Sequence, residues 1–353
     1  MRGIILHGGH GTRLRPLTHT GPKQLLPIAN KPMSQYCIES LRDAGITDIA
    51  IIIGGIGSNK VQEYYGTGKN FGVKFTYIHQ DHPLGIAHAI SLCHQFVGDE
   101  KFIVFLGDNI LEKSISEYKV EFEKSDADAS VLLCEVDNPT RFGIADVKNG
   151  VITKIMEKPK NPPTNLAVTG IYFLTPIIFD IISRLKPSWR NELEITEALQ
   201  MLLEEGHKIT YSTVTDYWKD TGTSDDIIHA NKFILEHTEP YFHGKKEDGA
   251  TLIGNVMVGE NSVIKSGAKI NGPVIIGKNC VIHCDTKIGS NTSIGDDSII
   301  SKCDIKDSII MSGCNIDGEF KIRDSIIAFN CTLTSKKNEF NSFLLGEGTK
   351  ISL

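Results

Sequence analysis

The sequence has no C-x-x-C pair, no long apolar run and no excess of positive charge. Its eight cysteines lack the spacing of a zinc site, so we expect buried, reduced thiols. No apolar run approaches the length of a membrane-spanning helix, and the first residues enter an apolar strand without the pattern of a secretory signal. A formal net charge of -6 at pH 7 argues against a nucleic-acid binder. These absences predict a cytoplasmic protein without membrane or nucleic-acid partners.

At 353 residues the chain is too long for one typical core, which predicts two domains. Up to about residue 237, short apolar runs alternate with amphipathic stretches. This alternation predicts an α/β domain, with a Rossmann-like, mostly parallel sheet and helices on both faces. The expected strands are Gly3–Leu6, Ile49–Ile53, Lys74–Ile78, Phe102–Leu106, Ala129–Val136 and Ile209–Thr213, and the expected helices include Ser34–Ala44 and Glu192–Glu205.

The apolar period changes to six from about Thr251. A large aliphatic residue recurs at every sixth position from Leu252 to Ile300, and a small residue stands four positions after nearly every one. This hexapeptide pattern indicates a parallel β-helix and resembles the left-handed kind. The register slips near Asp304–Asp307 and resumes at Ile310. We therefore predict a first domain of residues 1–237, a polar linker of residues 238–250 and a left-handed β-helix of residues 251–353.

The first apolar strand runs directly into a loop with three glycines in four positions, residues 8–11. Glycine lets a backbone turn tightly and lets its amides approach a ligand, since no Cβ stands in the way. A row of such amides forms an anion-binding concavity, and Arg13 and Lys23 add full positive charges beside it. The loop therefore predicts the binding of a polyphosphate.

Two common phosphate motifs do not fit this loop. A Walker loop ends in Gly-Lys-Ser/Thr, whereas Thr12 and Arg13 follow Gly11 here. A dinucleotide-binding fingerprint requires a small residue where this chain has Leu14.

The Gly-Gly-x-Gly-Thr-Arg-Leu string at residues 8–14 and the Lys-Gln-Leu-Leu-Pro string at residues 23–27 resemble the sugar nucleotidyltransferases. The second string is similar to their glucose-1-phosphate thymidylyltransferase branch, and the C-terminal hexads are similar to its long form. The resemblance covers essentially the whole chain. It implies transfer of a nucleotidyl group from dTTP to glucose 1-phosphate by in-line attack on the α-phosphate, with Mg²⁺ as the cofactor.

This reaction brings two anions together, so it requires positive charge and carboxylates for a divalent metal. Asp108 directly follows Phe102–Leu106 and Gly107, and Asp220 stands in the string Tyr-Trp-Lys-Asp-Thr-Gly-Thr farther along the chain. Mg²⁺ prefers one or two carboxylates together with phosphate oxygens and water. In the resembling family the matching aspartates hold Mg²⁺ together, and the residues that match Arg13 and Lys23 are catalytic.

The other expected site residues divide between the nucleotide and the sugar phosphate. A glutamine amide can donate to a carbonyl and accept from an N–H, which suits the O4/N3 edge of thymine or uracil. The resemblance implies that Glu157 accepts hydrogen bonds from sugar hydroxyls and that Lys158 binds the sugar's phosphate. The expected nucleotide-binding residues are Leu6, Gly8, Gly9, Gly11, Thr12, Gln24, Gln80, Pro83 and Gly85. The expected sugar-phosphate-binding residues are Asn109, Gly143, Glu157, Lys158, Val168, Gly170 and Tyr172.

Several alternatives stay open at this level. UTP, or another sugar 1-phosphate, would use the same framework, because a methyl contact separates thymine from uracil by only about 1–3 kcal/mol. Left-handed β-helices often serve acyltransferases, and His283 is the histidine to test for that activity. A non-catalytic regulatory subunit is a third alternative, although all four expected catalytic residues are present. Open coil ends predict a homo-oligomer.

Overall fold

The computed structural model describes residues 1–9, 11–335 and 348–350, and contacts group the chain into two compact units. The first, here called the sheet unit, consists of Met1–Gly11, Thr18–Leu25 and Met33–Asp220. The second, here called the coil unit, consists of Thr12–Leu17, Leu26–Pro32 and Thr221–Leu353. Both units are therefore discontinuous in the sequence.

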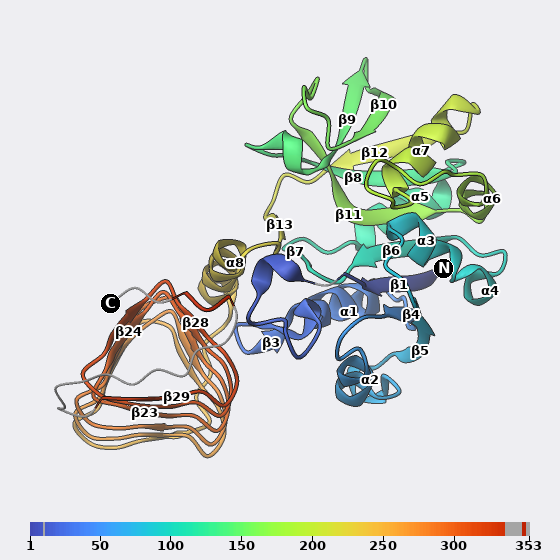
Figure 1. Cartoon of the computed structure of the whole chain (residues 1–353). Helices are drawn as coiled ribbons and strands as arrows, with labels where there is room; N and C mark the ends of the chain where they lie inside the picture. The colour runs from blue at the N-terminus through green and yellow to red at the C-terminus, as the bar shows by residue number, and fades with distance from the viewer. Residues whose placement is uncertain (10, 336–347, 351–353) are drawn as a thin grey trace. The chain divides into compact units, whose positions relative to one another are not determined.

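A nine-stranded sheet forms the centre of the sheet unit, with the strand path β10-β9-β11-β6-β1-β4-β5 and with β8 and β12 joined at β11 (Figure 1). The pairings make every strand run in one direction except β10 and β11, so the predicted mostly parallel sheet is confirmed. The strands are β1 (Arg2–His7), β4 (Asp48–Ile53), β5 (Lys74–His79), β6 (Phe102–Leu106), β8 (Ala129–Glu135), β9 (Gly143–Lys148), β10 (Val151–Glu157), β11 (Leu166–Leu174) and β12 (Ile209–Thr213). A separate two-stranded ribbon pairs β7 (Asn109–Leu111) with β13 (Trp218–Asp220).

Helices cover both faces of this sheet, because its central strands are apolar on both sides. On β1, Ile4 and Leu6 face one buried cluster while Ile5 faces the other. The first cluster includes side chains of α3, α6 and α7, and the second includes side chains of α1, α2 and α5. The helices of this unit are α1 (Met33–Asp43), α2 (Asn59–Tyr65), α3 (Ile86–Ser91), α4 (His94–Val97), α5 (Ser116–Lys124), α6 (Ile177–Ser183) and α7 (Ile195–Glu204).

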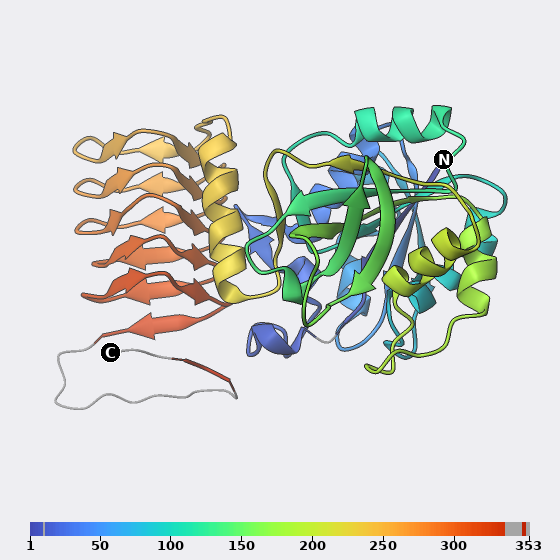
Figure 2. The ribbon, with the colours of Figure 1, turned by 90° about the horizontal axis from the view of Figure 1, so that it is seen from above.

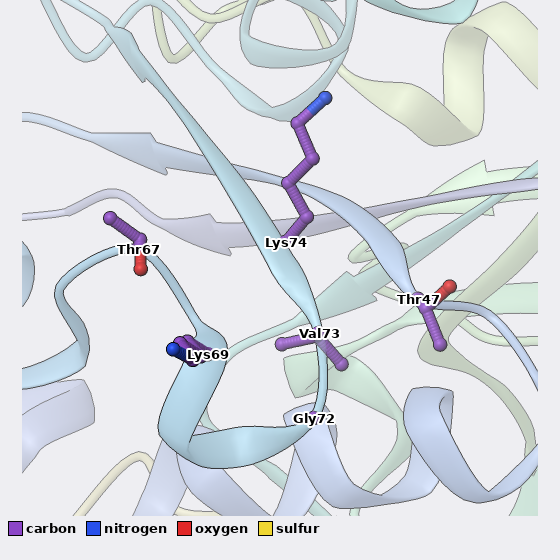
Figure 3. A pocket seen from close by; sticks show the side chains of 6 residues that line it. All are labelled: Thr47, Thr67, Lys69, Gly72, Val73 and Lys74. Atoms are coloured by element: carbon purple, nitrogen blue, oxygen red, sulfur yellow. The ribbon is translucent and has the colours of Figure 1, made fainter.

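A hollow of about 580 Å³ opens at the amino ends of β4 and β5 (Figure 3). It is lined by Thr47, Thr67, Lys69, Gly72, Val73 and Lys74. The glycine loop follows the carboxyl end of β1, which is parallel to β4. The hollow therefore lies at the opposite edge of the sheet from the glycine loop, and we do not assign it to the predicted nucleotide site.

The coil unit contains three parallel sheets that together enclose a triangular outline (Figure 1), with the coils stacked as Figure 2 shows. Val263 pairs with Val281, eighteen positions farther along, and Ile288 pairs with Ile305 across the predicted register slip. The first sheet contains β14 (Lys245–Lys246), β17 (Val263–Ile264), β20 (Val281–Ile282), β23 (Ile299–Ser301), β26 (Asn315–Asp317) and β29 (Thr332–Thr334). The second contains β15 (Thr251–Ile253), β18 (Lys269–Asn271), β21 (Lys287–Ile288), β24 (Asp304–Lys306) and β27 (Lys321–Arg323). The third contains β16 (Val256–Val258), β19 (Val274–Ile276), β22 (Thr292–Ile294), β25 (Ile309–Ile310) and β28 (Ile326–Ile327).

Helix α8 (Ser224–His237) and the hairpin of β2 (Pro27–Ile28) and β3 (Lys31–Pro32) belong to the coil unit as well. Met257 and Ile275, on the outer side of the third sheet, form a buried cluster with Leu235 of α8 and with Ala29 of the hairpin. The Nδ2 of Asn30 donates to the carbonyl oxygen of Ile294 at 2.6 Å. Contacts therefore group α8 with the coils. Strand β14, the first strand of the coils, lies within residues 238–250, the segment expected as a linker.

Asn231 of α8 is the polar centre of this packing and is 1% exposed. Its Oδ1 accepts from the backbone N–H of Ala29 at 2.8 Å and from Oγ of Ser293 at 2.6 Å. Its Nδ2 donates to the carbonyl oxygen of Asn291 at 3.2 Å. One buried amide thus joins the hairpin, the helix and two positions of the coils.

Across the described ranges, no helix is both long and apolar enough to cross a bilayer. All eight cysteines are free thiols, and five of them are buried.

Candidate active site

The glycine loop follows β1 and is fixed by two side-chain hydrogen bonds. Gly9 and Gly11 have φ values of 97° and 56°, a backbone region that favours glycine. Oγ1 of Thr18 donates to the carbonyl oxygen of Gly11 at 2.8 Å, and Nε2 of Gln24 donates to the carbonyl oxygen of Gly8 at 3.1 Å. A Cβ on Gly11 would stand 2.9 Å from Cγ2 of Thr18. The loop therefore requires glycine for both its conformation and its packing.

The segments that carry the two expected metal-binding aspartates are paired in the ribbon of β7 and β13. Asp220, at the end of β13, pairs with Asn109, the residue directly after Asp108. Nδ2 of Asn109 donates to Oδ1 of Asp108 at 3.1 Å, and Nε1 of Trp218 donates to Oδ1 of Asn109 at 2.7 Å. Facing residues of antiparallel strands have Cα atoms about 4.5–5.5 Å apart, so the fold brings the two carboxylate-bearing segments side by side.

Lys23 forms an ion pair with Asp108. Burial by itself raises the pKa of Asp108, but the charge of Lys23 and hydrogen bonds from Lys23 and Asn109 outweigh it and hold the pKa below its ordinary value. Asp108 is therefore anionic at neutral pH. The ion pair of Lys23 with the partly buried carboxylate of Asp108 lies close to the glycine loop, because the next residue, Gln24, donates to Gly8.

A glycine before Asp108 allows β1 and β6 to end close together. The N–H of Gly107 donates to the carbonyl oxygen of Leu6 at 3.0 Å, and a Cβ on Gly107 would stand 2.9 Å from that oxygen. His7 packs beside it, and among the described residues neither of its ring nitrogens has a hydrogen-bond partner. Burial lowers the pKa of His7 to about 3, against an opposing effect of the Asp108 charge. His7 is thus a neutral ring at the base of the loop.

A second charged group surrounds Glu157, at the end of β10. Its Oε1 lies 2.8 Å from Nζ of Lys158 and 3.2 Å from Nη1 of Arg190, while its Oε2 accepts from Oγ1 of Thr196 at 2.9 Å. Gly143 pairs with Glu157 across the β9–β10 ladder, and a Cβ on Gly143 would stand 2.5 Å from Cγ2 of Thr196. The expected residues Gly143, Glu157 and Lys158 are therefore brought together.

Strand β11 links this group to the two aspartates. A Cβ on Gly170 would stand 2.6 Å from Nδ2 of Asn109, so the absence of a side chain there makes room for Asn109. Burial raises the pKa of Tyr172, and the negative charges of Glu157 and Asp108 raise it further. One tyrosine on β11 is thus within electrostatic reach of both charged groups.

Gln80, directly after β5, lies beside the glycine loop. Gln80 is 6% exposed, and a Cβ on Gly8 would stand 3.3 Å from its Oε1. Gly85 has a φ of 104°, and a Cβ there would stand 2.5 Å from the carbonyl oxygen of Leu193. That oxygen also accepts from the N–H of Ala87 at 3.0 Å, which fixes the loop after Gln80.

Of the other expected site residues, Leu6 contacts Gly107 through its carbonyl oxygen, and the rest are not joined to these groups by any contact described above. Leu6 and Val168 are buried, and Pro83 is exposed. Thr12 and Arg13 lie in the 3₁₀ helix Thr12–Leu14, which groups with the coil unit, and both are exposed. The roles expected for them stay predictions.

A protein-family model described as nucleotidyl transferase matches residues 2–237, about two thirds of the chain. The chain belongs to this family. A second model, described as the GMPPB C-terminal domain, matches residues 270–352. The transferase activity expected from the glycine loop and the Lys-Gln-Leu-Leu-Pro string is thereby confirmed at the level of the family.

Relatives of this nucleotidyltransferase are similar over its whole length. It is 45% identical to the low-salt glycan biosynthesis nucleotidyltransferase Agl11 of Haloferax volcanii, with 100% of both chains covered. It is 35% identical to a glucose-1-phosphate thymidylyltransferase of Streptomyces griseus, covering 100% of this chain and 99% of that one. A Bacillus anthracis crystal structure assigned as a glucose-1-phosphate thymidylyltransferase, in complex with a sucrose, is 44% identical with a TM-score of 0.63, covering 66% of this chain and 94% of that one.

The sequence did not indicate Arg190 and Thr196 as site residues of this nucleotidyltransferase. Both lie more than thirty positions from Glu157; Thr196 reaches it from α7, which packs against β10, and Arg190 from the segment before α7. No local pattern marks either residue, because Arg190 stands in a charged segment that reads as an exposed loop. Only the fold could have identified them.

Proposed function

We propose that this nucleotidyltransferase transfers a thymidylyl group from dTTP to glucose 1-phosphate, giving dTDP-glucose and pyrophosphate. An oxygen of the sugar phosphate forms a bond to the α-phosphorus, and the bond from that phosphorus to the pyrophosphate oxygen breaks. The single observation that carries the proposal is the presence of two charged groups on either side of β11. One contains Lys23, Asp108 and Asp220, and the other contains Glu157 with its two cations, so each phosphate-bearing substrate has a separate group.

The cations divide between the two substrates in this proposal. Lys23 neutralises the triphosphate and the charge that grows on the departing pyrophosphate, and Arg13 is proposed to do the same. Lys158 and Arg190 flank Glu157 and bind the phosphate of the sugar. Glu157 is proposed to accept hydrogen bonds from sugar hydroxyls through Oε1, the oxygen that also pairs with Lys158 and Arg190.

The residues present also fit a magnesium ion. Asp108 is held anionic, and the β7–β13 ladder pairs Asp220 with Asn109, the residue after Asp108; together the two aspartates would supply the one or two carboxylates that Mg²⁺ prefers. When bound, the metal would neutralise phosphate charge and orient the triphosphate. Lys23 pairs with Asp108, so its ammonium group lies beside the carboxylate that would hold the metal and is placed to neutralise the phosphates that the metal would bind.

Gln24 and Gln80 are proposed to recognise the base through hydrogen bonds. Both are buried beside Gly8, and both present amides that suit the O4/N3 edge of a pyrimidine. Since thymine and uracil share this edge, we expect dTTP as the preferred nucleotide and UTP as a weaker one.

Pyrophosphate release tests this function. Purified full-length protein is mixed with Mg²⁺, glucose 1-phosphate and each of dTTP, UTP, CTP, ATP and GTP in turn, and the nucleotide sugar is identified by chromatography. We expect turnover with dTTP, slower turnover with UTP, and loss of at least about 100-fold in kcat for Asp108→Asn. Asp126→Asn is the matched control, because this exposed carboxylate pairs only with the surface Lys208 in the described contacts. Preference for a purine triphosphate, or silence with every nucleotide, would refute the proposal.

The architecture beyond the nucleotidyltransferase sheet is part of the proposal. We expect the three parallel sheets to form a left-handed β-helix at residues 251–353, after a domain of residues 1–237 and a linker of residues 238–250. The family match that ends at residue 237 supports the first boundary. Within the part of the chain that the structure describes, β14 and β29 are the end strands of the first sheet; because end strands can pair further, we expect a homo-oligomer, which sedimentation velocity would detect. Free, mostly buried cysteines agree with a cytoplasmic location.

A further inference from the structure

His88 makes a specific contact with the proposed base-reading glutamine. His88 stands on α3, and its Nδ1 lies 2.9 Å from Nε2 of Gln80. An amide nitrogen can only donate, so Nδ1 must accept, which places the proton of the neutral ring on Nε2 of His88. The same Nε2 of Gln80 lies 3.3 Å from the carbonyl oxygen of Gly85 and donates to it as well.

The two N–H groups of the Gln80 amide therefore donate to Nδ1 of His88 and to the carbonyl oxygen of Gly85. The amide oxygen is directed the other way, toward Gly8. Turning the amide by 180° would set its oxygen against the carbonyl oxygen of Gly85 and would require the other tautomer of His88. The bond to Gly85 would be replaced by a contact between two acceptors, and the bond to His88 would survive only with its tautomer changed, so the amide has one favoured orientation.

We propose that His88 is a positioning residue for base selection, holding Gln80 with its oxygen toward the base and its nitrogen away from it. This inference rests on the proposed function and goes beyond it, since it assigns Gln80 the role of acceptor only. The N3–H of thymine or uracil donates to such an acceptor. Cytosine carries a lone pair at N3 instead, so at that position the oxygen of Gln80 would face another acceptor, and a bond to the N4 amino group would require the base to shift.

An amide of Gln80 held in this orientation would discriminate against cytosine, which the shape of the pocket alone could not do. Cytosine and uracil have nearly the same outline, and a cavity that fits one admits the other. A site that is built to accept a hydrogen bond from its substrate rejects an analogue that lacks the donor more strongly than a site that reads size. His88 contributes by making the turned amide unfavourable.

A matched pair of variants tests this role. Asn and Leu have nearly the same size and shape, but only Asn offers an oxygen in the place of the Nδ1 acceptor. For His88→Leu we expect the preference for dTTP over dCTP, as a ratio of kcat/KM, to fall about five- to tenfold, with KM for dTTP raised and kcat nearly unchanged. For His88→Asn we expect both quantities within about twofold of the unchanged protein.

Calorimetric titration of the full-length protein with dTTP and with dCTP gives the same comparison without turnover. A fall in the dTTP preference for His88→Leu together with its retention for His88→Asn supports the inference. An unchanged preference for His88→Leu, or an equal loss in both variants, overturns it. If His88→Leu does not fold, His88→Asp decides, because an acceptor-only side chain must keep at least the original preference. Failure of the unchanged protein to use any pyrimidine nucleotide would instead refute the proposed function.

Discussion

The substitution Asn231→Leu should weaken the coil unit strongly while leaving its shape intact. Leucine matches asparagine in size, but it leaves the N–H of Ala29, the hydroxyl of Ser293 and the carbonyl oxygen of Asn291 without their partner. Ala29 is 8% exposed and Ser293 is fully buried, so water cannot replace the lost bonds freely. Each buried polar group left unpaired costs about 1–3 kcal/mol, and burial of the leucine returns about 1–2 kcal/mol. The three groups together cost about 3–9 kcal/mol, so the net loss should be about 1–8 kcal/mol.

Urea unfolding followed by two probes separates the units. Trp189 and Trp218 are the only tryptophans and both lie in the sheet unit, so their fluorescence follows that unit, while circular dichroism follows both. We expect the dichroism midpoint to fall well before the fluorescence midpoint. The exposed Asn315→Leu serves as the control and should change little. Adding Ser293→Ala to Asn231→Leu should recover about 1 kcal/mol, since the unpaired hydroxyl is removed. A loss below about 1 kcal/mol, or no recovery, would show that this amide does not hold the unit together.

Three further outcomes concern the active site. Thr196→Val should raise KM for glucose 1-phosphate about tenfold and leave KM for dTTP unchanged, because it removes the hydroxyl that donates to Glu157; equal effects on both substrates in steady-state kinetics would contradict this. Arg190→Met should weaken glucose 1-phosphate binding at least about tenfold by titration calorimetry, whereas Arg184→Met, a surface cation paired with Glu205, should not. Chelation of divalent metal should abolish pyrophosphate release, and Asp220→Asn should raise the Mg²⁺ concentration needed to restore it; an unchanged requirement would remove Asp220 from the metal site.

Strands and coils that follow a short repeating pattern of apolar residues could be predicted closely from the sequence. The strand Ile209–Thr213 matches β12 at both ends, and the aliphatic residues of the hexads from Val258 to Ile300 face the inside of the coils with almost no exposure. The predicted slip near Asp304 appears as pairings that shorten from eighteen positions to seventeen. These features can be predicted from the sequence because each residue's environment depends on neighbours within one strand or one coil.

Features that depend on distant packing could not be predicted. Strand β11 gave no alternating pattern, since it is buried on both faces, yet it separates the two charged groups of the site. Its reversed direction depends on its partners β6 and β8 rather than on its own residues. Likewise, nothing local in the hairpin around Ala29 indicates that it would bind Asn231, two hundred and two positions away. Sequence motifs identified Asp108 and Asp220 as candidate site residues. The orientation of the Gln80 amide could be assigned only once the structure placed His88 beside it.

The discontinuity of the two units has a consequence for synthesis on the ribosome. Asn30 leaves the ribosome early, but Ile294, whose carbonyl oxygen it binds, is made 264 residues later. At about 5–20 residues per second, the hairpin waits roughly 13–50 seconds for its partner. During that interval Ala29 has no coil to cover it, and the segments on both sides of the hairpin, which carry Lys23 and α1, belong to a different unit. Neither unit can be completed before the other has begun, so a nascent chain stalled before the coils would display an apolar hairpin that chaperones recognise.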